Sequence, residues 1–385
     1  MNNPLEAYAE EIIRCNKCGF CQATCPVYDV RRDEASAPRG LLRLIRALYD
    51  GQLSPPSDGY AQRIYRCSLC GVCAPTCPSG VEVDGILQAA RDDLAARGLL
   101  PTALQDLGRT VQASHHLLED AAQAPLAWTE ELPHPPEGLG SRAELVYFVG
   151  CVASAFPAAH SIPRAFVQVL ERAGQRYTLL AGEEWCCGYP LLVNGQRGEA
   201  RELMAHNLET VRSLGAEGVV FTCPSCYHLW AHIYPQELGG LGFEVIHATE
   251  LLADLLANEE LAMGPLPWQV TYHDPCDLGR RSGIYDVPRQ VLAAIPGVTL
   301  VEMTENRANA FCCGGGGNLD AFDPALSQAV AGRRLAQAQA TDAQVLATAC
   351  GRCKRALAAA AHRNGVPMEV LDIVELVERA TRKGA

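Results

Sequence analysis

The chain has 385 residues, 48% of them hydrophobic, and a formal net charge of −12. This length allows two or three domains with packed cores. The acidic balance argues against nucleic acid as the main partner, because phosphate binding needs concentrated positive charge.

The first residues lack the basic segment and the apolar run of a leader peptide, and no apolar run reaches the roughly 20 residues that span a bilayer. We therefore expect a cytoplasmic protein without a transmembrane segment of its own, attached to the inner membrane, if at all, through a partner. In that compartment thiols stay reduced, so the eighteen cysteines indicate metal clusters rather than disulfides.

Residues 1–100 contain two four-cysteine motifs and two stretches with helical spacing of apolar residues, at 38–48 and 83–94. Both motifs read C-x2-C-x2-C-x3-C-P. Their cysteines are Cys15, Cys18, Cys21 and Cys25, then Cys67, Cys70, Cys73 and Cys77. We expect a mainly α-helical domain with cluster-binding loops.

The spacing of the two motifs is typical of two cubane [4Fe-4S] clusters in which the fourth cysteine of each motif ligates the other cluster. We predict one cluster on Cys15, Cys18, Cys21 and Cys77. We predict the second on Cys67, Cys70, Cys73 and Cys25. Structural zinc is the alternative, but it takes four ligands and would leave the third evenly spaced cysteine unexplained.

Residues 101–143 are predicted to form a helical linker that ends in a proline-rich stretch at 132–140. A long internal repeat follows, in which the first cysteines lie 125 residues apart and the last cysteines 127 apart. The expected elements are β-like runs at 145–151 and 269–276, helices at 163–173 and 287–294, and apolar strands at 218–223 and 344–350. Strands alternating with helices indicate a parallel α/β module in each copy. We place the modules at 144–258 and 266–385, which makes the chain α+β and multidomain.

Each module has five cysteines in the order Cys…Cys-Cys-Gly…Cys-x-x-Cys. They are Cys151, Cys186, Cys187, Cys223 and Cys226 in the first, and Cys276, Cys312, Cys313, Cys350 and Cys353 in the second. A cubane has four iron corners, so five thiolates indicate either one free cysteine or a cluster of another shape. Zinc or an unfilled structural site in one module is the alternative.

Several segments resemble a known family. Cys186-Cys187-Gly188, Thr222–Cys226, Tyr272–Arg280 and Phe311–Gly315 resemble the CCG repeats of the catalytic subunit of heterodisulfide reductase. Cys18–Cys21 and Pro38–Gly40 are similar to the iron-sulfur subunit of glycolate oxidase and of bacterial lactate oxidation complexes. The resemblance implies a non-cubane [4Fe-4S] cluster held by all five cysteines of each module. Relatives of the glycolate oxidase type often have incomplete modules, whereas both sets are complete here.

His273, three residues before Cys276, is a candidate catalytic acid or hydrogen-bond donor to a cluster sulfur. A structural hydrogen bond to the nearby turn is the alternative. The same two interpretations apply to His228 and His160. Gly314–Gly317 lacks the Lys and Ser/Thr of a phosphate-binding loop. Close packing of backbone on a cluster explains these glycines better.

No G-x-G-x-x-G motif is present, so we expect flavin chemistry to lie on a partner. The leading hypothesis is an iron-sulfur subunit that relays electrons from an FAD-containing partner, which oxidises a 2-hydroxy acid such as glycolate or lactate, to a quinone or a membrane cytochrome. The alternative is a subunit that reduces a disulfide at a non-cubane cluster. A redox sensor or assembly scaffold is a third hypothesis, although four clusters exceed what sensing requires.

Overall fold

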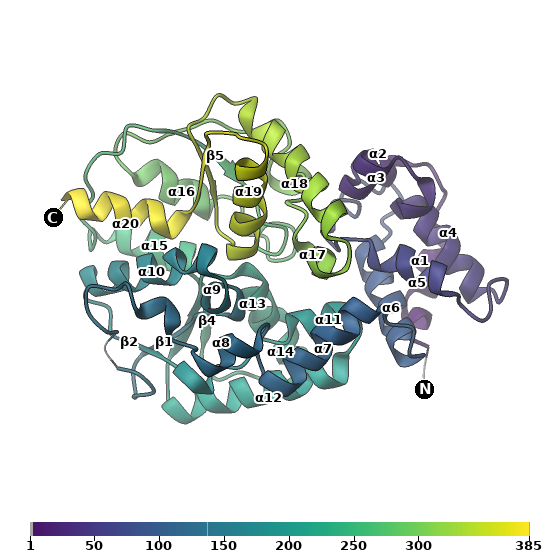
Figure 1. The fold of residues 1–385 in the computed structure, drawn as a ribbon, viewed down its shortest axis with the longest axis horizontal. Coiled ribbons are helices and arrows are strands. Elements are labelled where there is room, and N and C mark those ends of the chain that lie inside the picture. The colour runs from purple at the N-terminus through teal and green to yellow at the C-terminus, as the bar shows by residue number, and fades with distance from the viewer. Residues whose placement is uncertain (1–2, 137, 385) are drawn as a thin grey trace.

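The computed structural model of the chain describes residues 3–136 and 138–384, so Glu137 of the proline-rich stretch lies outside the described residues. Figure 1 shows a helical N-terminal domain beside two α/β modules, with the two ends of the chain on opposite sides of the molecule. This architecture confirms the expected α+β class.

The N-terminal domain is built from short helices joined by cysteine-bearing loops. They are α1 (Ala9–Arg14), α2 (Phe20–Ala23), α3 (Pro26–Arg31), α4 (Pro38–Tyr49), α5 (Asp58–Tyr65) and α6 (Val83–Ala96). Helices α3 and α4 each start on a proline, whose fixed φ and missing N–H suit the first helical position. Helix α4 buries Leu41 and Ile45 and packs against α6, and this helix pair carries the domain core.

The segment after the N-terminal domain packs on the first module. It forms α7 (Thr102–Ser114) and α8 (Glu119–Gln123), and α7 lies against α11 (Tyr189–Asn194) of that module. Further along, Leu139 bridges in parallel to Leu179 at the edge of the first sheet. The predicted linker is therefore a structural extension of the first module.

Each module contains a four-stranded parallel sheet, and the two sheets have the same strand order. The first sheet runs β2-β1-β3-β4, with strands β1 (Leu145–Phe148), β2 (Tyr177–Leu179), β3 (Gly218–Phe221) and β4 (Glu244–His247). The second runs β6-β5-β7-β8, with strands β5 (Gln269–His273), β6 (Thr299–Leu300), β7 (Val345–Thr348) and β8 (Glu369–Asp372). All pairings are parallel, so the sequence repeat is a structural repeat.

Helices cover the sheets, as parallel strands require. In the first module they are α9 (Cys151–Ala155), α10 (Ser161–Arg172), α11, α12 (Arg197–Leu214), α13 (Pro224–His228), α14 (Tyr234–Leu238) and α15 (Ala248–Ala257). In the second they are α16 (Val287–Ala294), α17 (Leu319–Phe322), α18 (Pro324–Gln339), α19 (Gly351–Arg363) and α20 (Ile373–Gly384). Helix α20 of the second module lies against α10 of the first, which joins the modules.

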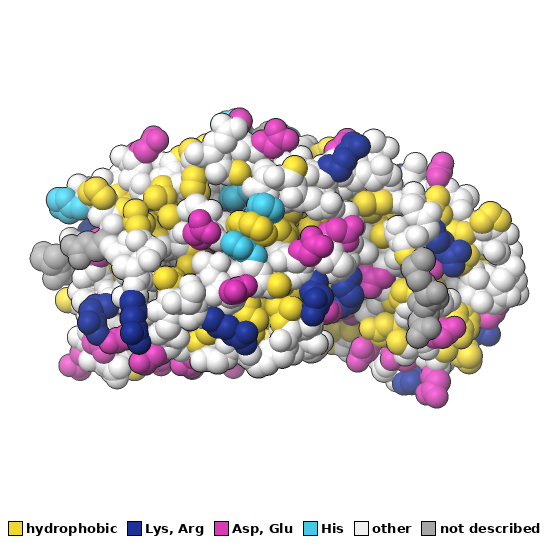
Figure 2. Space-filling view, turned by 90° about the horizontal axis from the view of Figure 1, so that it is seen from below, with side chains coloured by type: hydrophobic (Ala, Val, Ile, Leu, Met, Phe, Trp, Pro, Cys, Tyr) yellow, Lys and Arg dark blue, Asp and Glu magenta, His cyan; other side chains and the backbone are white. Residues whose placement is uncertain are grey.

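None of the helices in the described ranges has both the length and the apolarity needed to cross a bilayer. On the face shown in Figure 2, Lys and Arg side chains lie interspersed with Asp and Glu, without an extended basic surface.

Candidate iron-sulfur sites

Four cysteines from the two motifs of the N-terminal domain line one cavity, which we call the outer four-cysteine site. They are Cys15, Cys18, Cys21 and Cys77. Burial raises the pKa of the Cys21 thiol to about 11, and the neighbouring Cys15, Cys18 and Cys77 thiols contribute to this rise. Four thiols that oppose each other's ionisation in this way form a donor set suited to a cationic group.

The remaining four cysteines of this domain line a second cavity, the inner four-cysteine site. They are Cys25, Cys67, Cys70 and Cys73. Cys25 comes from the first motif and caps helix α3, where its Sγ accepts a hydrogen bond from the Tyr28 N–H at 3.5 Å. The structure thus divides the eight cysteines into the two groups of four predicted from their spacing.

The five cysteines of the first module also converge, at the first-module site. Cys151 and Cys223 follow shortly after the ends of β1 and β3, and the carboxyl ends of parallel strands lie at the same edge of a sheet. The Sγ atoms of Cys151 and Cys186 lie 3.8 Å apart. Cys187 interacts with the thiols of Cys186 and Cys226, and these contacts lower the pKa of Cys187.

The second module repeats this arrangement at the second-module site. Cys313 interacts with the thiols of Cys312 and Cys353, which lowers the pKa of Cys313. Cys350 caps α19, where its Sγ accepts the Cys353 N–H at 3.4 Å. Cys276 lies close enough to Cys312 and Cys313 for their charges to raise its pKa, after the larger effect of burial. All five cysteines therefore belong to one sulfur-rich site.

The glycine after each vicinal pair is needed for close backbone packing. Gly188 has φ of +95° and Gly314 has φ of +84°, the left-handed region that favours glycine. A Cβ on Gly314 would stand 2.3 Å from the Ser327 carbonyl oxygen, and one on Gly188 would stand 3.1 Å from that of Ala200. The Cys-Cys-Gly turns can approach α12 and α18 only because the side chain is missing.

The two module sites face each other across the module interface. Ser225, inside the first C-x-x-C, donates a 2.5 Å hydrogen bond to Asp277, which follows Cys276. In the opposite direction, Arg352 of the second C-x-x-C pairs with Asp320 at 3.1 Å, which raises its pKa, and the charges of Cys151 and Cys223 add to this rise. Each module thus contributes a residue from its cysteine loop to the surroundings of the other site.

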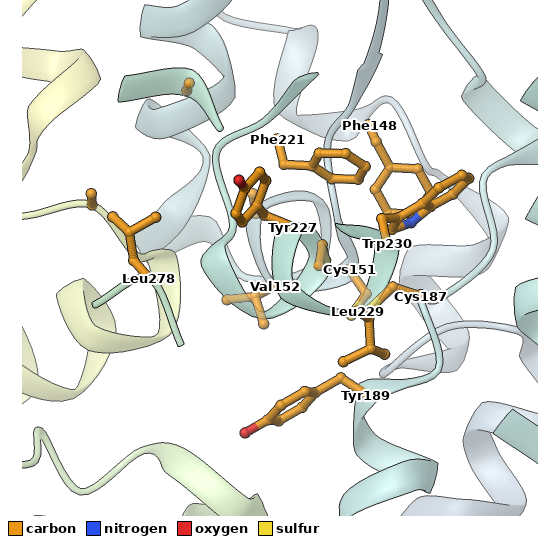
Figure 3. Packing of buried hydrophobic residues seen from close by; sticks show 14 of the residues in the cluster. Phe148, Cys151, Val152, Cys187, Tyr189, Phe221, Tyr227, Leu229, Trp230 and Leu278 are labelled. Atoms are coloured by element: carbon orange, nitrogen blue, oxygen red, sulfur yellow. The ribbon is translucent and has the colours of Figure 1, made fainter. Parts of the chain in front are cut away.

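Tyr189 lies between the two module sites. It follows Cys187-Gly188 of the first module, and its hydroxyl is close enough to Asp277 and Cys276 of the second for their charges to raise its pKa. Figure 3 shows its ring extending away from Cys187 with the hydroxyl at the far end. Burial raises the pKa of this hydroxyl well above its usual range, so it keeps its proton at neutral pH.

The inner four-cysteine site adjoins the second-module site. The thiols of Cys70 and Cys312 interact directly, and this contact raises the pKa of Cys70. Arg280 stabilises the contact by donating from Nε to the Cys70 carbonyl at 2.7 Å. Gly316 packs so closely on the inner site that a Cβ there would lie 2.6 Å from the Ser68 carbonyl oxygen. The glycine run therefore packs on the backbone of a cysteine loop, while its expected packing on a cluster stays a prediction.

One buried arginine joins all three parts of the chain. Arg91 of α6 is fully buried and donates to the carbonyl oxygens of Cys67, Val193 and Gly317. These acceptors belong to the N-terminal domain, the first module and the second module. Because the guanidinium is charged and buried, its hydrogen bonds fix the three parts relative to one another.

The structure places the three histidines singled out from the sequence in different surroundings. His273 is buried within the second-module site, where one ring nitrogen and the Sγ atoms of Cys313 and Cys353 lie within 4.8 Å of one another. Its Nδ1 accepts from Arg334 Nε at 3.0 Å, a partner on α18 and not the adjacent turn. His228 Nδ1 lies 3.2 Å from the Ser282 hydroxyl and His160 Nε2 lies 3.0 Å from the Ser154 carbonyl oxygen. Among the described residues, neither ring belongs to a group of three potential metal ligands.

The residues that join the sites are not predicted by the cysteine pattern. Arg91 and Arg280 act on backbone carbonyls far away in the chain, and Tyr189 was passed over although it directly follows Cys-Cys-Gly. A signal for Arg91 was present, because an arginine on the apolar face of a helix that also carries Leu87 and Leu94 must find buried acceptors.

Comparisons with known proteins agree with this geometry. Residues 11–81 match the 4Fe-4S dicluster domain, and residues 145–229 and 270–358 match the cysteine-rich domain CCG. Fold and matched domains thus define an iron-sulfur electron-transfer component of an oxidoreductase.

Three curated relatives narrow the class. The chain is 34% identical to the D-type chain of dihydromethanophenazine:CoB--CoM heterodisulfide reductase of Methanosarcina mazei, over 96% of this chain and 94% of that protein. It is 28% identical to EtfAB:quinone oxidoreductase of Syntrophomonas wolfei, over 79% of this chain and 48% of that protein. It is 26% identical to one of the subunits of fumarate reductase (CoM/CoB) of Methanothermobacter marburgensis, over 95% of this chain and 72% of that protein. The chain belongs to the family of the D-type heterodisulfide reductase subunits.

Proposed function

We propose that the chain takes up electrons at its N-terminal domain and uses them at the two module sites to reduce a disulfide. The observation that carries the proposal is that both five-cysteine sets are complete and adjoin one interface, where Ser225 and Asp277 are hydrogen-bonded. A chain that only relays electrons between two partners needs one site at which electrons leave. Two adjacent sites match a reaction that consumes two electrons and releases two thiols.

The eighteen cysteines fit iron-sulfur groups, since each site offers thiol donors in close contact. The expected ligands are those predicted from the sequence: two cubane clusters on the four-cysteine sites and two non-cubane [4Fe-4S] clusters on the module sites. When bound, these groups supply one-electron transfer. The alternative of zinc in one module is disfavoured because five thiolates exceed the four ligands of a structural zinc site.

The reaction is balanced by two electrons and two protons, which convert one disulfide into two thiols. Tyr189 is the proposed donor for one proton. Its hydroxyl stays protonated and lies close enough to Cys276, across the interface, for the charge of Cys276 to raise its pKa. Arg352, whose guanidinium pairs with Asp320 and lies near Cys151 and Cys223, is suited to hold an anionic substrate group through its remaining N–H groups. Its positive charge also favours a thiolate leaving group.

Electrons are proposed to enter at the outer four-cysteine site. Cys18 is exposed there, and Ile13 and Phe20, close to it in the chain, are 59% and 60% exposed. Residues 13–43 carry six Lys or Arg against three Asp or Glu, although the whole chain has a formal net charge of −12. An electron-carrying protein with an acidic rim around an apolar centre fits this face.

A second candidate is a conduit between a partner flavoprotein and a quinone, with no disulfide chemistry. The relative named EtfAB:quinone oxidoreductase favours it. The 2-hydroxy-acid partner expected from the sequence is not named in any of the three relatives above and stays a prediction, as does attachment to a membrane partner.

The test is anaerobic mixing of the chemically reduced chain with a mixed disulfide of low molecular weight, followed by absorbance of the clusters and release of thiols. The proposal expects cluster oxidation with two thiols released per disulfide consumed. Cluster oxidation by a quinone, without thiol release from the disulfide, would favour the conduit.

A further inference from the structure

The two modules differ at one structurally equivalent position. Phe148 is the last residue of β1 and stands three residues before Cys151, while His273 is the last residue of β5 and stands three residues before Cys276. Phe148 pairs with the last residue of β3, and His273 pairs with the last residue of β7. An imidazole therefore stands in the second module where the first has a phenyl ring.

In the first module this position is apolar. The ring of Phe148 lies 5.4 Å from that of Phe221 and 5.6 Å from that of Trp230, measured between centroids. Figure 3 shows these three aromatic side chains grouped together near Cys151 and Cys187. Phe148 offers no hydrogen-bond donor to the first-module site.

In the second module the hydrogen bond from Arg334 fixes which nitrogen of His273 carries the proton. Arginine stays protonated in proteins, so its Nε–H is a donor and Nδ1 must be the acceptor. A neutral imidazole with an accepting Nδ1 carries its proton on Nε2. Nε2 is therefore the ring nitrogen free to donate, and one ring nitrogen of His273 lies within 4.8 Å of the Sγ atoms of Cys313 and Cys353.

The same hydrogen bond excludes His273 as a metal ligand. Coordination through Nε2 would move the ring proton to Nδ1, where it would oppose the N–H of Arg334. Burial keeps the pair in place, because Arg334 and His273 are 0% and 1% exposed. His273 is thus suited to donate a hydrogen bond to sulfur and unsuited to replace a thiolate.

We propose that His273, positioned by Arg334, makes the two module sites unequal by donating a hydrogen bond to the sulfurs of the second-module site, which raises its reduction potential above that of the first-module site. Hydrogen bonds to cluster sulfurs favour the reduced, more negative state. The second-module site is also the one that contacts the inner four-cysteine site through Cys70 and Cys312. Electrons therefore collect there first, and the first-module site is reduced last.

This inference rests on the proposed function, because it assumes that both module sites hold clusters. The test compares three variants, His273→Phe, His273→Leu and His273→Gln, with Phe148→Leu as the matched control in the other module. Each is purified anaerobically, assayed for iron and acid-labile sulfide, and titrated potentiometrically with detection by electron paramagnetic resonance.

The apolar variants should make one-electron reduction of the second-module site about tenfold less favourable, a shift of ~59 mV to lower potential. His273→Gln, whose amide N–H can donate, should retain most of the wild-type potential, and Phe148→Leu should leave the second-module site unchanged. If the apolar variants lose iron while the Gln variant keeps it, the donor role is also supported, since Gln supplies the N–H without the imidazole.

Unchanged potentials in iron-replete His273→Phe and His273→Leu would overturn the inference. Loss of iron from all three His273 variants would also overturn it, by making the imidazole a ligand. A wild-type chain whose modules hold no iron would instead refute the proposed function, so the two failures are distinguishable.

Discussion

Cys70 and Cys312 stand in different domains, yet their thiols are close enough for Cys312 to raise the pKa of Cys70, and Arg280 binds the backbone on both sides of this junction. Its guanidinium donates to the Cys70 carbonyl at 2.7 Å and to those of Ala310 and Ala308 at 2.9 and 3.2 Å. This junction connects the inner four-cysteine site to the second-module site, and electrons passing between the two domains would cross here.

Arg280→Gln should weaken this junction. Carbonyl oxygens left without a charged donor cost about 2 kcal/mol of unfolding free energy, and reduction of the module sites should slow relative to that of the N-terminal sites. Rapid-mixing absorbance and urea unfolding measure the two effects. Arg363→Gln is the control, because Arg363 is exposed at the end of α19; equal behaviour of both variants would show that Arg280 has no special role.

Gly314→Ala should disrupt the second-module site. The new Cβ would meet the Ser327 carbonyl oxygen at 2.3 Å in a left-handed backbone, costing about 3 kcal/mol, and the vicinal cysteines should lose iron. Gly365→Ala is the matched control: it has φ of +62° with nothing within 4 Å of the new Cβ, so it should cost about 1 kcal/mol and keep its iron. Iron assays and unfolding curves decide between these outcomes.

Arg91→Met should loosen the assembly of the three parts. Several buried carbonyl oxygens, including those of Cys67, Val193 and Gly317, would lose their donor, at a cost of about 3 kcal/mol or more. Limited proteolysis should then cut between the N-terminal domain and the modules, and the midpoint of urea unfolding should fall. A variant that unfolds at the wild-type midpoint would show that the three parts are held together by other contacts.

Tyr189→Phe should slow disulfide reduction without changing cluster content. Removing a positioned proton donor lowers the rate by about 100-fold or more, while the ring still fills its place between the module sites. Stopped-flow thiol release measures the rate, and potentiometric titration checks that the potentials are unchanged. Wild-type thiol release in this variant would assign the proton to another group.

The sequence predicted the parts that depend on local pattern. The apolar runs that lead into Cys223 and Cys350 are strands, and the helix expected at 287–294 spans those residues. It did not predict β2, β4, β6 and β8, because an edge strand as short as Thr299–Leu300 has no measurable periodicity.

The arrangement of the sites was less accessible from the sequence. Cysteine spacing alone grouped Cys77 with the first motif and Cys25 with the second, since the ligand exchange between motifs is a local rule. The contacts of Cys70 with Cys312 and of His273 with Arg334 depend on how separate modules and helices pack. A pattern in one chain carries no record of such packing, so the order of the sites and the difference between the modules emerged only from the structure.

The most direct test of the central claim, that this chain holds four iron-sulfur sites in one relay, is the count of iron and acid-labile sulfide per chain after anaerobic purification. The account predicts about sixteen irons and a similar amount of sulfide, as four [4Fe-4S] clusters require. A count of about eight, with the N-terminal sites filled and the ten module cysteines titrating as free thiols or binding zinc, would contradict it.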